Sequence, residues 1–185
     1  MKTEASITVF AGGIGPEREI SLATGKALTE SLGKRFEARM LDLTEPELPD
    51  GIDPKNSIVF PAIHGTFGED GTLQSMLDQG GFSYAGCGPD ASRLCMDKHR
   101  SKEVVREAGV RVARDFVFSD PKEIDLDQVL SEIGQDLVLK PTDQGSSVAL
   151  YVLNGKDELT DALSAIGSGN WMIERRVFGR EVTLG

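Results

Sequence analysis

The stretch Thr8–Ser21, TVFAGGIGPEREIS, indicates how the chain begins to fold. An apolar run ends in a glycine turn, and a charged segment with helical spacing follows the turn. A buried strand that leads through such a turn into a helix is typical of a parallel α/β sheet, and turns of this kind often hold a dinucleotide. The stretch therefore predicts an α/β fold and raises the question of what its turn binds.

The turn departs from the dinucleotide-binding pattern G-x-G-x-x-G at the third glycine. Gly13 and Gly15 are present, but Arg18 stands where that glycine lets the helix approach the strand and the pyrophosphate. Glu17 and Glu19 fall in the first helical turn, where their charge suits the helix dipole but repels a pyrophosphate. The turn therefore favours a cation, such as a substrate ammonium group. The alternative is that the glutamates only cap a helix and that Arg18 is solvated.

Residues 1–90 continue the alternation of strands and helices. Strands are expected in SITVFAG, FEARMLDL, NSIVFPAIHG and FSYAGCG, and helices over Glu17–Leu32 and in GTLQSMLDQGG. Because parallel strands need a crossover between them, this alternation predicts a parallel sheet with helices on its faces.

Residues 91–185 have a different pattern. One long charged helix, or two, in PDASRLCMDKHRSKEVVREAGV leads to the strand RDFVFSD and the amphipathic helix KEIDLDQVLSEIG. The hairpin DLVLKPTDQGSSVALYVL, the helix KDELTDALSAIG and a second hairpin in WMIERRVFGREVTLG follow. Hairpins and helices in this order predict an α+β domain with an antiparallel sheet, so we expect domains at 1–90 and 91–185. The chain stops after the apolar alternation EVTL, which suggests a truncated strand.

The composition argues against several classes of protein. The formal net charge is −10, whereas a nucleic acid or an anionic membrane as main partner requires a basic face. No apolar run approaches the roughly 20 residues of a membrane span, and we expect no signal peptide. The two cysteines, Cys87 and Cys95, fit no zinc pattern and are expected to be reduced, buried thiols in a cytoplasmic protein.

The loop HGTFGEDG, residues 64–71, follows an expected buried strand, where parallel sheets place ligand-binding loops. Its three glycines allow tight turns and close backbone approach. His64 stands at the strand end and is able to donate to an anion, while Glu69 and Asp70 are able to bind the free N–H groups of the next helix. The alternative is a structural loop with a hydrogen-bonded histidine.

Lys140 ends the apolar run LVLK and requires a negative partner if it is buried. The loop TDQGSS follows at once, and a lysine beside a Gly-Ser-Ser loop between two strands suits a phosphate site. The sequence contains no Walker loop. Lys98 lies within MDKHRSK. Taken alone, it is better explained as a solvated lysine on a helix.

The segment MIERRVFGRE offers two carboxylates for a base and a sugar. Glu174 ends an apolar strand and is able to accept from an exocyclic amine, and Glu181, beyond a turn, is able to accept from ribose hydroxyls. The alternative is that both glutamates form salt bridges with neighbouring arginines, which are Arg175, Arg176 and Arg180.

Five motifs, GGIGPEREIS, HGTFGEDGTLQ, MDKHRSK, LVLKPTDQGSSV and IERRVFGREVT, resemble in order and distance those of D-alanine–D-alanine ligases of the ATP-grasp superfamily. The resemblance covers essentially the whole chain, and HGxxGEDG is its most specific part. It implies a Rossmann-like pre-ATP-grasp domain with a parallel sheet, followed by a truncated α+β ATP-grasp subdomain. It also implies a cytoplasmic enzyme of peptidoglycan precursor synthesis and a possible homodimer through the first domain.

The resemblance assigns ATP to the second domain. The ATP-binding residues that it implies are Lys98, Lys140, Gly145, Ser147, Glu174, Arg175, Val177 and Glu181. The two lysines would hold the phosphates, and the QGSS loop would close over them. Glu174 would accept from the adenine amino group, and the backbone at Arg175 and Val177 would complete the adenine edge. Glu181 would bind the ribose hydroxyls.

The resemblance also implies a site for D-alanine and two catalytic residues, Glu17 and Ser146. Glu17 would hold the ammonium of the first D-alanine, oriented through Ser146, and His64 would lie near the carboxylate of this substrate. The γ-phosphoryl of ATP would pass to that carboxylate, and the amine of a second D-alanine would attack the acyl phosphate. D-Lactate and D-serine stay open as alternative second substrates.

Two departures from the family pattern affect these expectations. Ala149 stands where the family usually has glycine, which could stiffen the loop. The family's Mg²⁺ ligands are expected beyond Gly185, so we expect the chain alone to be inactive. Two other hypotheses are a short non-catalytic module that binds ATP or D-alanine, and an NAD(P)-dependent oxidoreductase, which only the opening turn suggests.

Overall fold

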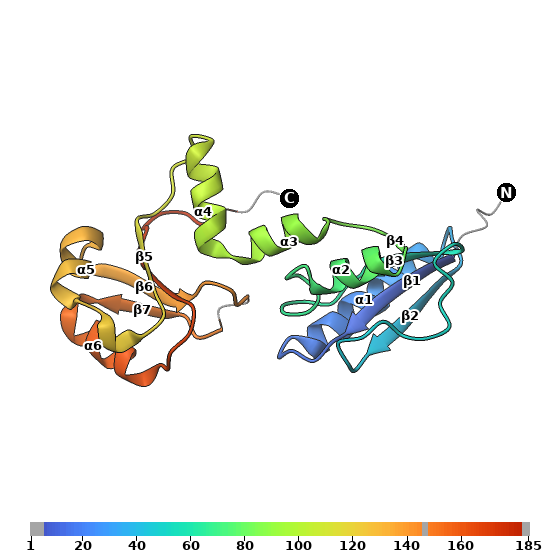
Figure 1. The fold of residues 1–185 in the computed structure, drawn as a ribbon, viewed down its shortest axis with the longest axis horizontal. Coiled ribbons are helices and arrows are strands. Elements are labelled where there is room, and N and C mark those ends of the chain that lie inside the picture. The colour runs from blue at the N-terminus through green and yellow to red at the C-terminus, as the bar shows by residue number, and fades with distance from the viewer. Residues whose placement is uncertain (1–5, 146–147, 183–185) are drawn as a thin grey trace. The chain divides into compact units, whose positions relative to one another are not determined.

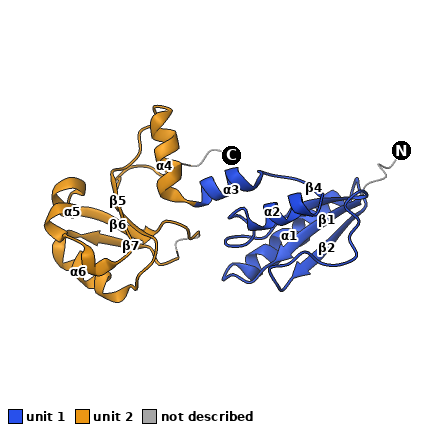
Figure 2. Cartoon of the chain, in the orientation of Figure 1, with its two compact units in different colours: residues 1–96 blue, residues 97–185 orange. Residues whose placement is uncertain are grey.

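A computed structural model describes residues 6–145 and 148–182 of the chain (Figure 1). The contacts divide the chain into two compact units, 1–96 and 97–185, which are coloured separately in Figure 2. Each unit has its own sheet and its own buried core. The assignment of separate domains to 1–90 and 91–185 stays a prediction.

Unit 1 is built on a four-stranded parallel sheet with the order β2-β1-β3-β4. Its strands are β1 (Ser6–Gly12), β2 (Ala38–Leu43), β3 (Ser57–Pro61) and β4 (Ser83–Tyr84). Its helices are α1 (Arg18–Leu32), α2 (Thr72–Gln79) and α3 (Pro89–Met96). The α/β fold with a parallel sheet, predicted from the strand–turn–helix pattern, is confirmed.

The central strand β1 is buried on both faces, as its continuous apolar run requires. Val9 and Ala11 pack in a cluster with leucines of α1, whereas Phe10 packs on the opposite face with leucines of α2. Helix α1 lies so close to β1 that a Cβ on Gly25 would overlap the side chain of Ala11. The sheet therefore fixes the start of α1, and with it Glu17, at the carboxyl end of β1.

Unit 2 is built on a four-stranded antiparallel sheet with the order β5-β8-β6-β7, which confirms the predicted antiparallel sheet. Its strands are β5 (Asp115–Phe118), β6 (Asp136–Pro141), β7 (Tyr151–Asn154) and β8 (Trp171–Arg175). Its helices are α4 (Lys98–Glu107), the 3-10 helix η1 (Pro121–Glu123), α5 (Leu126–Ile133) and α6 (Gly155–Ala165).

The two faces of this sheet have different characters. One face carries Leu137, Leu139 and Ile173, which pack with apolar side chains of α5 and α6 to form the core of unit 2. The alternate residues of the same strands, including Lys140 and Glu174, belong to the other face because side chains alternate along a strand. The sheet thus places charged residues opposite its core.

The charged segment after β4 forms two helices. Helix α3 ends at Met96, and α4 begins at Lys98. Asp97 between them has extended backbone dihedrals, and its carboxylate caps α4 by accepting from the N–H of Arg100 at 3.0 Å. The break at Asp97 therefore sets the first turn of α4, where Lys98 lies.

The predicted second hairpin is wrong within the described residues. Strand β8 ends at Arg175, and residues 176–182 form no strand. A returning strand would have to pair with an edge of β8, but β5 and β6 already occupy both edges. The apolar residues of the segment are therefore left exposed, as Val177, Phe178 and Val182 are.

The prediction that both cysteines are buried is also wrong. Cys87 and Cys95 are free thiols, and both are exposed. Cys87 lies in the loop before α3, and α3 contributes only Ser92 to the buried residues of the described chain. Amino-acid type alone therefore does not predict whether these two cysteines are buried or exposed. Within the described ranges, no helix is long and apolar enough to cross a membrane.

Candidate functional site

Arg18 lies against the carboxyl ends of β1 and β2. Its Nη1 donates to the carbonyl oxygens of Gly13 at 3.1 Å and Leu43 at 3.2 Å, and its Nη2 lies 2.6 Å from Asp42 Oδ2. A Cβ on Gly12, whose φ is 89°, would lie 2.6 Å from Arg18 Nη1, so this position requires glycine. Arg18 is held by three acceptors, and its cation fills space beside the glycine turn.

Glu17 approaches the HGTFGEDG loop. It lies at the N-cap position of α1, yet its side chain caps no N–H group of the described helix. A Cβ added to Gly65, whose φ is 69°, would lie 2.9 Å from Glu17 Oε2, so the carboxylate lies directly against this glycine. Since His64 precedes Gly65, the fold brings two of the predicted substrate-binding residues to one site in unit 1.

His64 is positioned by two side chains. Its Nε2 lies 3.2 Å from Thr24 Oγ1 on α1, and its Nδ1 lies 3.6 Å from Glu69 Oε1. Glu69 is fixed in turn, because its Oε2 accepts from the N–H of Gly65 at 2.8 Å. The imidazole is half-buried and is therefore available to a ligand while its ring is held in place.

The rest of the loop is fixed by side chains bonded to its backbone. Asp70 accepts from the N–H groups of Phe67 at 3.2 Å and Thr72 at 2.9 Å, which confirms its predicted place at the start of the next helix. Gln74 donates from Nε2 to the carbonyl oxygen of Gly68 at 2.7 Å. Phe67 is buried with a φ of 73°, an unusual conformation for a residue with a side chain. The loop is a built structure rather than a loose connection.

A cavity of about 510 Å³ opens beside His64 in unit 1. It lies among α1, the end of β3, the HGTFGEDG loop and α3. Cys87 and Cys95 both belong to its lining, which accounts for their exposure.

In unit 2, Lys140 and Glu174 form an ion pair on the face of the sheet opposite its core. Lys140 Nζ donates to Glu174 Oε1. Lys102 of α4 lies on the other side of the carboxylate, with its Nζ 2.8 Å from Glu174 Oε2 and 3.1 Å from Asp115 Oδ1. The alternative interpretation paired Glu174 with neighbouring arginines. The structure instead pairs its carboxylate with two lysines, Lys102 and Lys140.

Lys98 is held at the loop that follows Lys140. Its Nζ donates to the carbonyl oxygens of Thr142, at 3.3 Å, and Gln144, and its backbone N–H donates to Thr142 at 2.9 Å. Burial, followed by the positive charge of Lys140, lowers the pKa of Lys98 below its ordinary value. The positive charges of Lys98 and Lys140 therefore disfavour each other beside the loop at Thr142 and Gln144.

The carboxylates of this cluster remain charged although they are largely shielded from solvent. Burial raises the pKa of Glu174, but the hydrogen bonds and charges of Lys102 and Lys140 outweigh it and leave this pKa below its ordinary value. The same balance holds for Asp115, where bonds from His99 and Lys102 lower a pKa that burial raises. The cluster is thus a fixed network of opposite charges.

The sequence predictions missed Lys102 and Asp115. Lys102 lies four residues after Lys98 on α4, a spacing that puts both lysines on one face of a helix. Asp115 is the direct register partner of Glu174 in the antiparallel pair β5–β8. Only the first of these two relations is visible in the sequence, because strand register between distant segments is not.

The other residues predicted to bind ATP do not belong to the cluster of Lys98, Lys140 and Glu174. Glu181 and Val177 are exposed after β8, and the backbone N–H of Arg175 donates to Arg114 at 2.9 Å. Gly145 accepts from the N–H of Val148 at 3.1 Å. The remaining predictions fall on Ser146 and Ser147, which lie outside the described residues.

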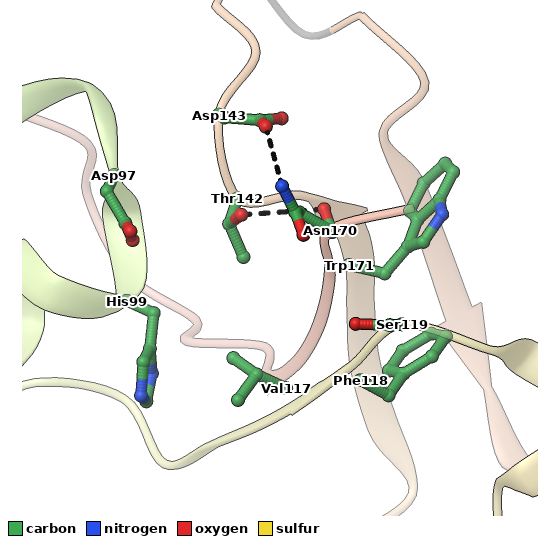
Figure 3. Close-up of a pocket in the computed structure, with 9 residues that line it drawn as sticks. All are labelled: Asp97, His99, Val117, Phe118, Ser119, Thr142, Asp143, Asn170 and Trp171. Carbon is green, nitrogen blue, oxygen red and sulfur yellow. Dashed lines mark hydrogen bonds between the residues drawn. The ribbon is translucent and has the colours of Figure 1, made fainter. Parts of the chain in front are cut away.

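A second cavity, of about 320 Å³, adjoins the start of α4 in unit 2. Figure 3 shows Asp97 and His99 on one side of it, and Thr142, Asp143 and Asn170 on the other. Asn170 Nδ2 donates to Asp143 Oδ2 at 3.1 Å. The cavity is lined by none of the described residues predicted to bind ATP, although Thr142 also accepts from Lys98.

The described residues do not fit a metal centre. Within 6–145 and 148–182, no group of three or more His, Cys, Asp or Glu side chains is arranged to hold a metal ion. Asp115 and Glu174 of unit 2 are instead paired with lysines, and Asp115 is also paired with His99.

Comparison with known proteins relates the chain to one family. The family model for the N-terminus of D-ala D-ala ligases matches residues 41–87. The chain is 39% identical over 184 residues to the D-alanine–D-alanine ligase of Clostridium beijerinckii, and the match covers 96% of this chain and 60% of that protein. The chain therefore spans about three-fifths of the length of such curated relatives.

Solved structures give the same relation. The D-alanine–D-alanine ligase of Bacillus anthracis complexed with ATP is 28% identical, with a TM-score of 0.80 over 95% of this chain and 60% of that chain. The VanG D-Ala:D-Ser ligase of Enterococcus faecalis is 26% identical, with a TM-score of 0.81 over 96% of this chain and 64% of that chain. Along nearly its whole length, this chain is related to the D-alanine–D-alanine ligases and resembles their N-terminal portion.

Proposed function

We propose that the chain provides the first-substrate site and one face of the ATP site of an ATP-dependent D-alanine–D-alanine ligase. The observation that carries the proposal is the cluster of Lys98, Lys140 and Glu174 in unit 2. It offers two ammonium groups for phosphates, Lys98 on α4 and Lys140 on β6, and a charged carboxylate for an amine, Glu174 on β8. The relation to a ligase that was solved in complex with ATP supports this use of the cluster.

The proposed reaction has two steps. The γ-phosphoryl group of ATP passes to the carboxylate of a first D-alanine and leaves ADP, because a carboxylate is a poor acyl donor until it is phosphorylated. The amine of a second D-alanine then attacks the acyl carbon, loses a proton, and displaces inorganic phosphate. Lys98 and Lys140 supply positive charge along the phosphates, and the loop at Gly145 to Ser147 excludes water that would hydrolyse the acyl phosphate.

Unit 1 is proposed to bind the first D-alanine. The carboxylate of Glu17 accepts from the substrate ammonium group, and His64 donates to the substrate carboxylate. The contact of Glu17 with Gly65 supports this proposal, because it places an acceptor beside the histidine. Ser146, proposed to orient Glu17, lies outside the described residues.

The nucleoside is proposed to lie along β8. Glu174 accepts from the adenine amino group, the backbone at Arg175 and Val177 completes the adenine edge, and Glu181 accepts from the ribose hydroxyls. Glu181 is exposed, so its carboxylate is accessible to a ligand.

We propose that the 185-residue chain alone does not turn over. The Mg²⁺ that the resemblance implies finds no ligand group among the described residues, so its ligands are proposed to belong to the portion of the relatives that this chain does not span. Release of ADP by the purified chain, dependent on D-alanine, would contradict this proposal. The working enzyme is proposed to be cytoplasmic and to form a homodimer through unit 1.

Calorimetric titration tests the nucleotide site. We expect the chain to bind ATP and not NAD, and we expect Lys98→Ala and Lys140→Ala each to weaken ATP binding on the order of tenfold or more, since each removes a charge-assisted hydrogen bond. Lys122→Ala is the matched control, because Lys122 is an exposed lysine of the same unit. Binding of NAD as tight as that of ATP, or no response to either variant, would refute the proposed site.

A further inference from the structure

Lys102 joins two largely buried carboxylates from neighbouring strands. Its Nζ lies 2.8 Å from Glu174 Oε2 and 3.1 Å from Asp115 Oδ1, and these two residues are opposite each other in the register of β8 and β5. The side chains of Lys102, Glu174 and Asp115 are only 13%, 16% and 2% exposed. The ammonium group is therefore confined between two acceptors.

We infer that Lys102 is a positioning residue for nucleotide recognition, which holds the Glu174 carboxylate in place as the acceptor for the adenine amino group. The inference rests on the proposed function, because it takes Glu174 as the residue that meets the base. Lys102 itself touches no part of the nucleotide in this account. It acts through Glu174.

The need for a second lysine follows from the position of Lys140. In the structure Lys140 donates to Glu174, yet its proposed partner is a phosphate of ATP. When Lys140 turns toward the phosphate, Lys102 is the one cation among the described residues that stays bonded to Glu174, which is largely buried. A buried carboxylate without a cation is costly, so without Lys102 the carboxylate would retain Lys140 and compete with the phosphate.

Asp115 explains why Lys102 stays in place. Its carboxylate accepts from His99 Nδ1 at 2.7 Å, from Arg106 Nη2 at 3.2 Å and from Lys102 at 3.1 Å. Asp115 is thus fixed from several sides, and it fixes the lysine that it binds. Arg106 differs from Lys102 because it bonds to Asp115 and not to Glu174, and its side chain is half exposed.

The preference of the site for adenine over hypoxanthine measures whether the Glu174 carboxylate is held in place. Adenine presents an exocyclic amine, which donates to a carboxylate, whereas hypoxanthine presents a carbonyl oxygen at the same place. An oriented, charged Glu174 therefore favours ATP over ITP, and the loss of its orientation reduces this preference. A merely structural lysine would change the binding of both nucleotides by the same factor.

The test is calorimetric titration of the chain with ATP and with ITP. We expect Lys102→Met to reduce the preference for ATP over ITP on the order of tenfold, and Lys102→Arg to restore part of it. Arg106→Met is the matched control and should keep the wild-type ratio. An unchanged ratio in Lys102→Met would overturn the inference. Lys102→Gln, which retains a donor without the charge, takes the place of Lys102→Met if that variant does not fold.

A measurement without nucleotide separates this inference from the proposed function. The Glu174 carboxyl is followed by carbon-13 NMR during a pH titration of glutamate-labelled chain, with Glu174→Gln to assign its signal. We expect Lys102→Met to raise the pKa of Glu174, and Arg106→Met to leave it nearly unchanged. Identical titration in the wild type and Lys102→Met would overturn the inference. Failure of the wild type to bind ATP would refute the proposed function, whereas the NMR titration would still test whether Lys102 controls the Glu174 carboxylate.

Discussion

Arg18 Nη2 lies 2.6 Å from Asp42 Oδ2, across the carboxyl ends of the two neighbouring strands β1 and β2. The guanidinium also donates to two backbone carbonyl oxygens beside the glycine turn. A positively charged side chain thus fills the place next to a turn that resembles a dinucleotide site, and it joins two strands and a helix of unit 1.

The first prediction concerns this ion pair. Arg18→Ala should lower the free energy of unfolding by about 1–2 kcal/mol, since three partly exposed hydrogen bonds are lost together. Arg18→Gly completes the G-x-G-x-x-G pattern but should gain no NAD binding, because Glu17 and Glu19 remain at the helix start. Urea unfolding and calorimetry measure the two effects. Tight NAD binding by Arg18→Gly would show that the missing glycine alone had excluded the dinucleotide.

The second prediction concerns Gly65. A Cβ at this residue would lie 2.9 Å from Glu17 Oε2, so Gly65→Ala should displace the carboxylate proposed to bind the D-alanine ammonium group. We expect D-alanine binding to weaken on the order of tenfold or more. Gly81→Ala is the control, because Gly81 has a nearly identical φ of 71°, but a Cβ added there would meet no atom within 4 Å. Equal effects of both variants on D-alanine binding would argue against the role of Glu17.

The third prediction concerns Ala149, which follows Val148 in the loop between β6 and β7. Its φ is 51°, in the left-handed region that favours glycine. Ala149→Gly should therefore raise the free energy of unfolding by up to about 1 kcal/mol, despite the added freedom of the unfolded chain. Ala113→Gly, at a residue without a positive φ, should lower it instead. Thermal unfolding of the two variants compares them directly, and destabilisation by both would contradict the strain assigned to Ala149.

The fourth prediction concerns pH. The folded chain holds the pKa of Glu174 and of Asp115 below their ordinary values, with Lys102 bonded to both groups. The unfolded chain therefore binds more protons at mildly acidic pH, so the stability that these groups contribute is present above their ordinary pKa values. This stability is lost as pH falls through the lower pKa values of the folded state.

Glu174→Gln should accordingly reduce the loss of unfolding free energy between neutral pH and about pH 4. The exposed Glu107 at the end of α4 offers the control Glu107→Gln, which should leave this loss unchanged. Urea unfolding at several pH values measures both. A steeper loss of stability in Glu174→Gln than in the wild type would reverse the sign that the charge network requires.

Much of the fold was predictable from local patterns. The apolar run through Val9 and Phe10 predicts a strand buried on both faces. The spacing after Glu17 predicts a helix over Glu17–Leu32, and the structure has it at Arg18–Leu32. The second hairpin was not predictable in the same way. Alternating apolar residues such as Val182 suggest a strand, but a strand forms only where a neighbouring strand offers a free edge.

The candidate site was predictable in part for a related reason. Glu17 stands at the start of a helix, and Lys140 and Glu174 stand at the ends of strands, which is visible in the sequence. The predicted strand end at His64 is wrong, because β3 already ends at Pro61 and His64 lies in the loop that follows. The bond of Lys102 to Asp115 and Glu174 depends on the register of two strands that are far apart in the chain. Local patterns carry no information about that register, so this network required the structure.

The most direct test of the central claim is to map ATP on the chain by two-dimensional amide NMR. The account predicts that ATP shifts the amide signals of Lys98, Lys140 and β8 in unit 2 and leaves those of the turn from Gly13 to Arg18 unchanged. D-Alanine should instead shift the signals of Glu17 and Gly65. A map in which ATP perturbs the glycine turn of unit 1 and spares the lysine–glutamate cluster of unit 2 would contradict the account.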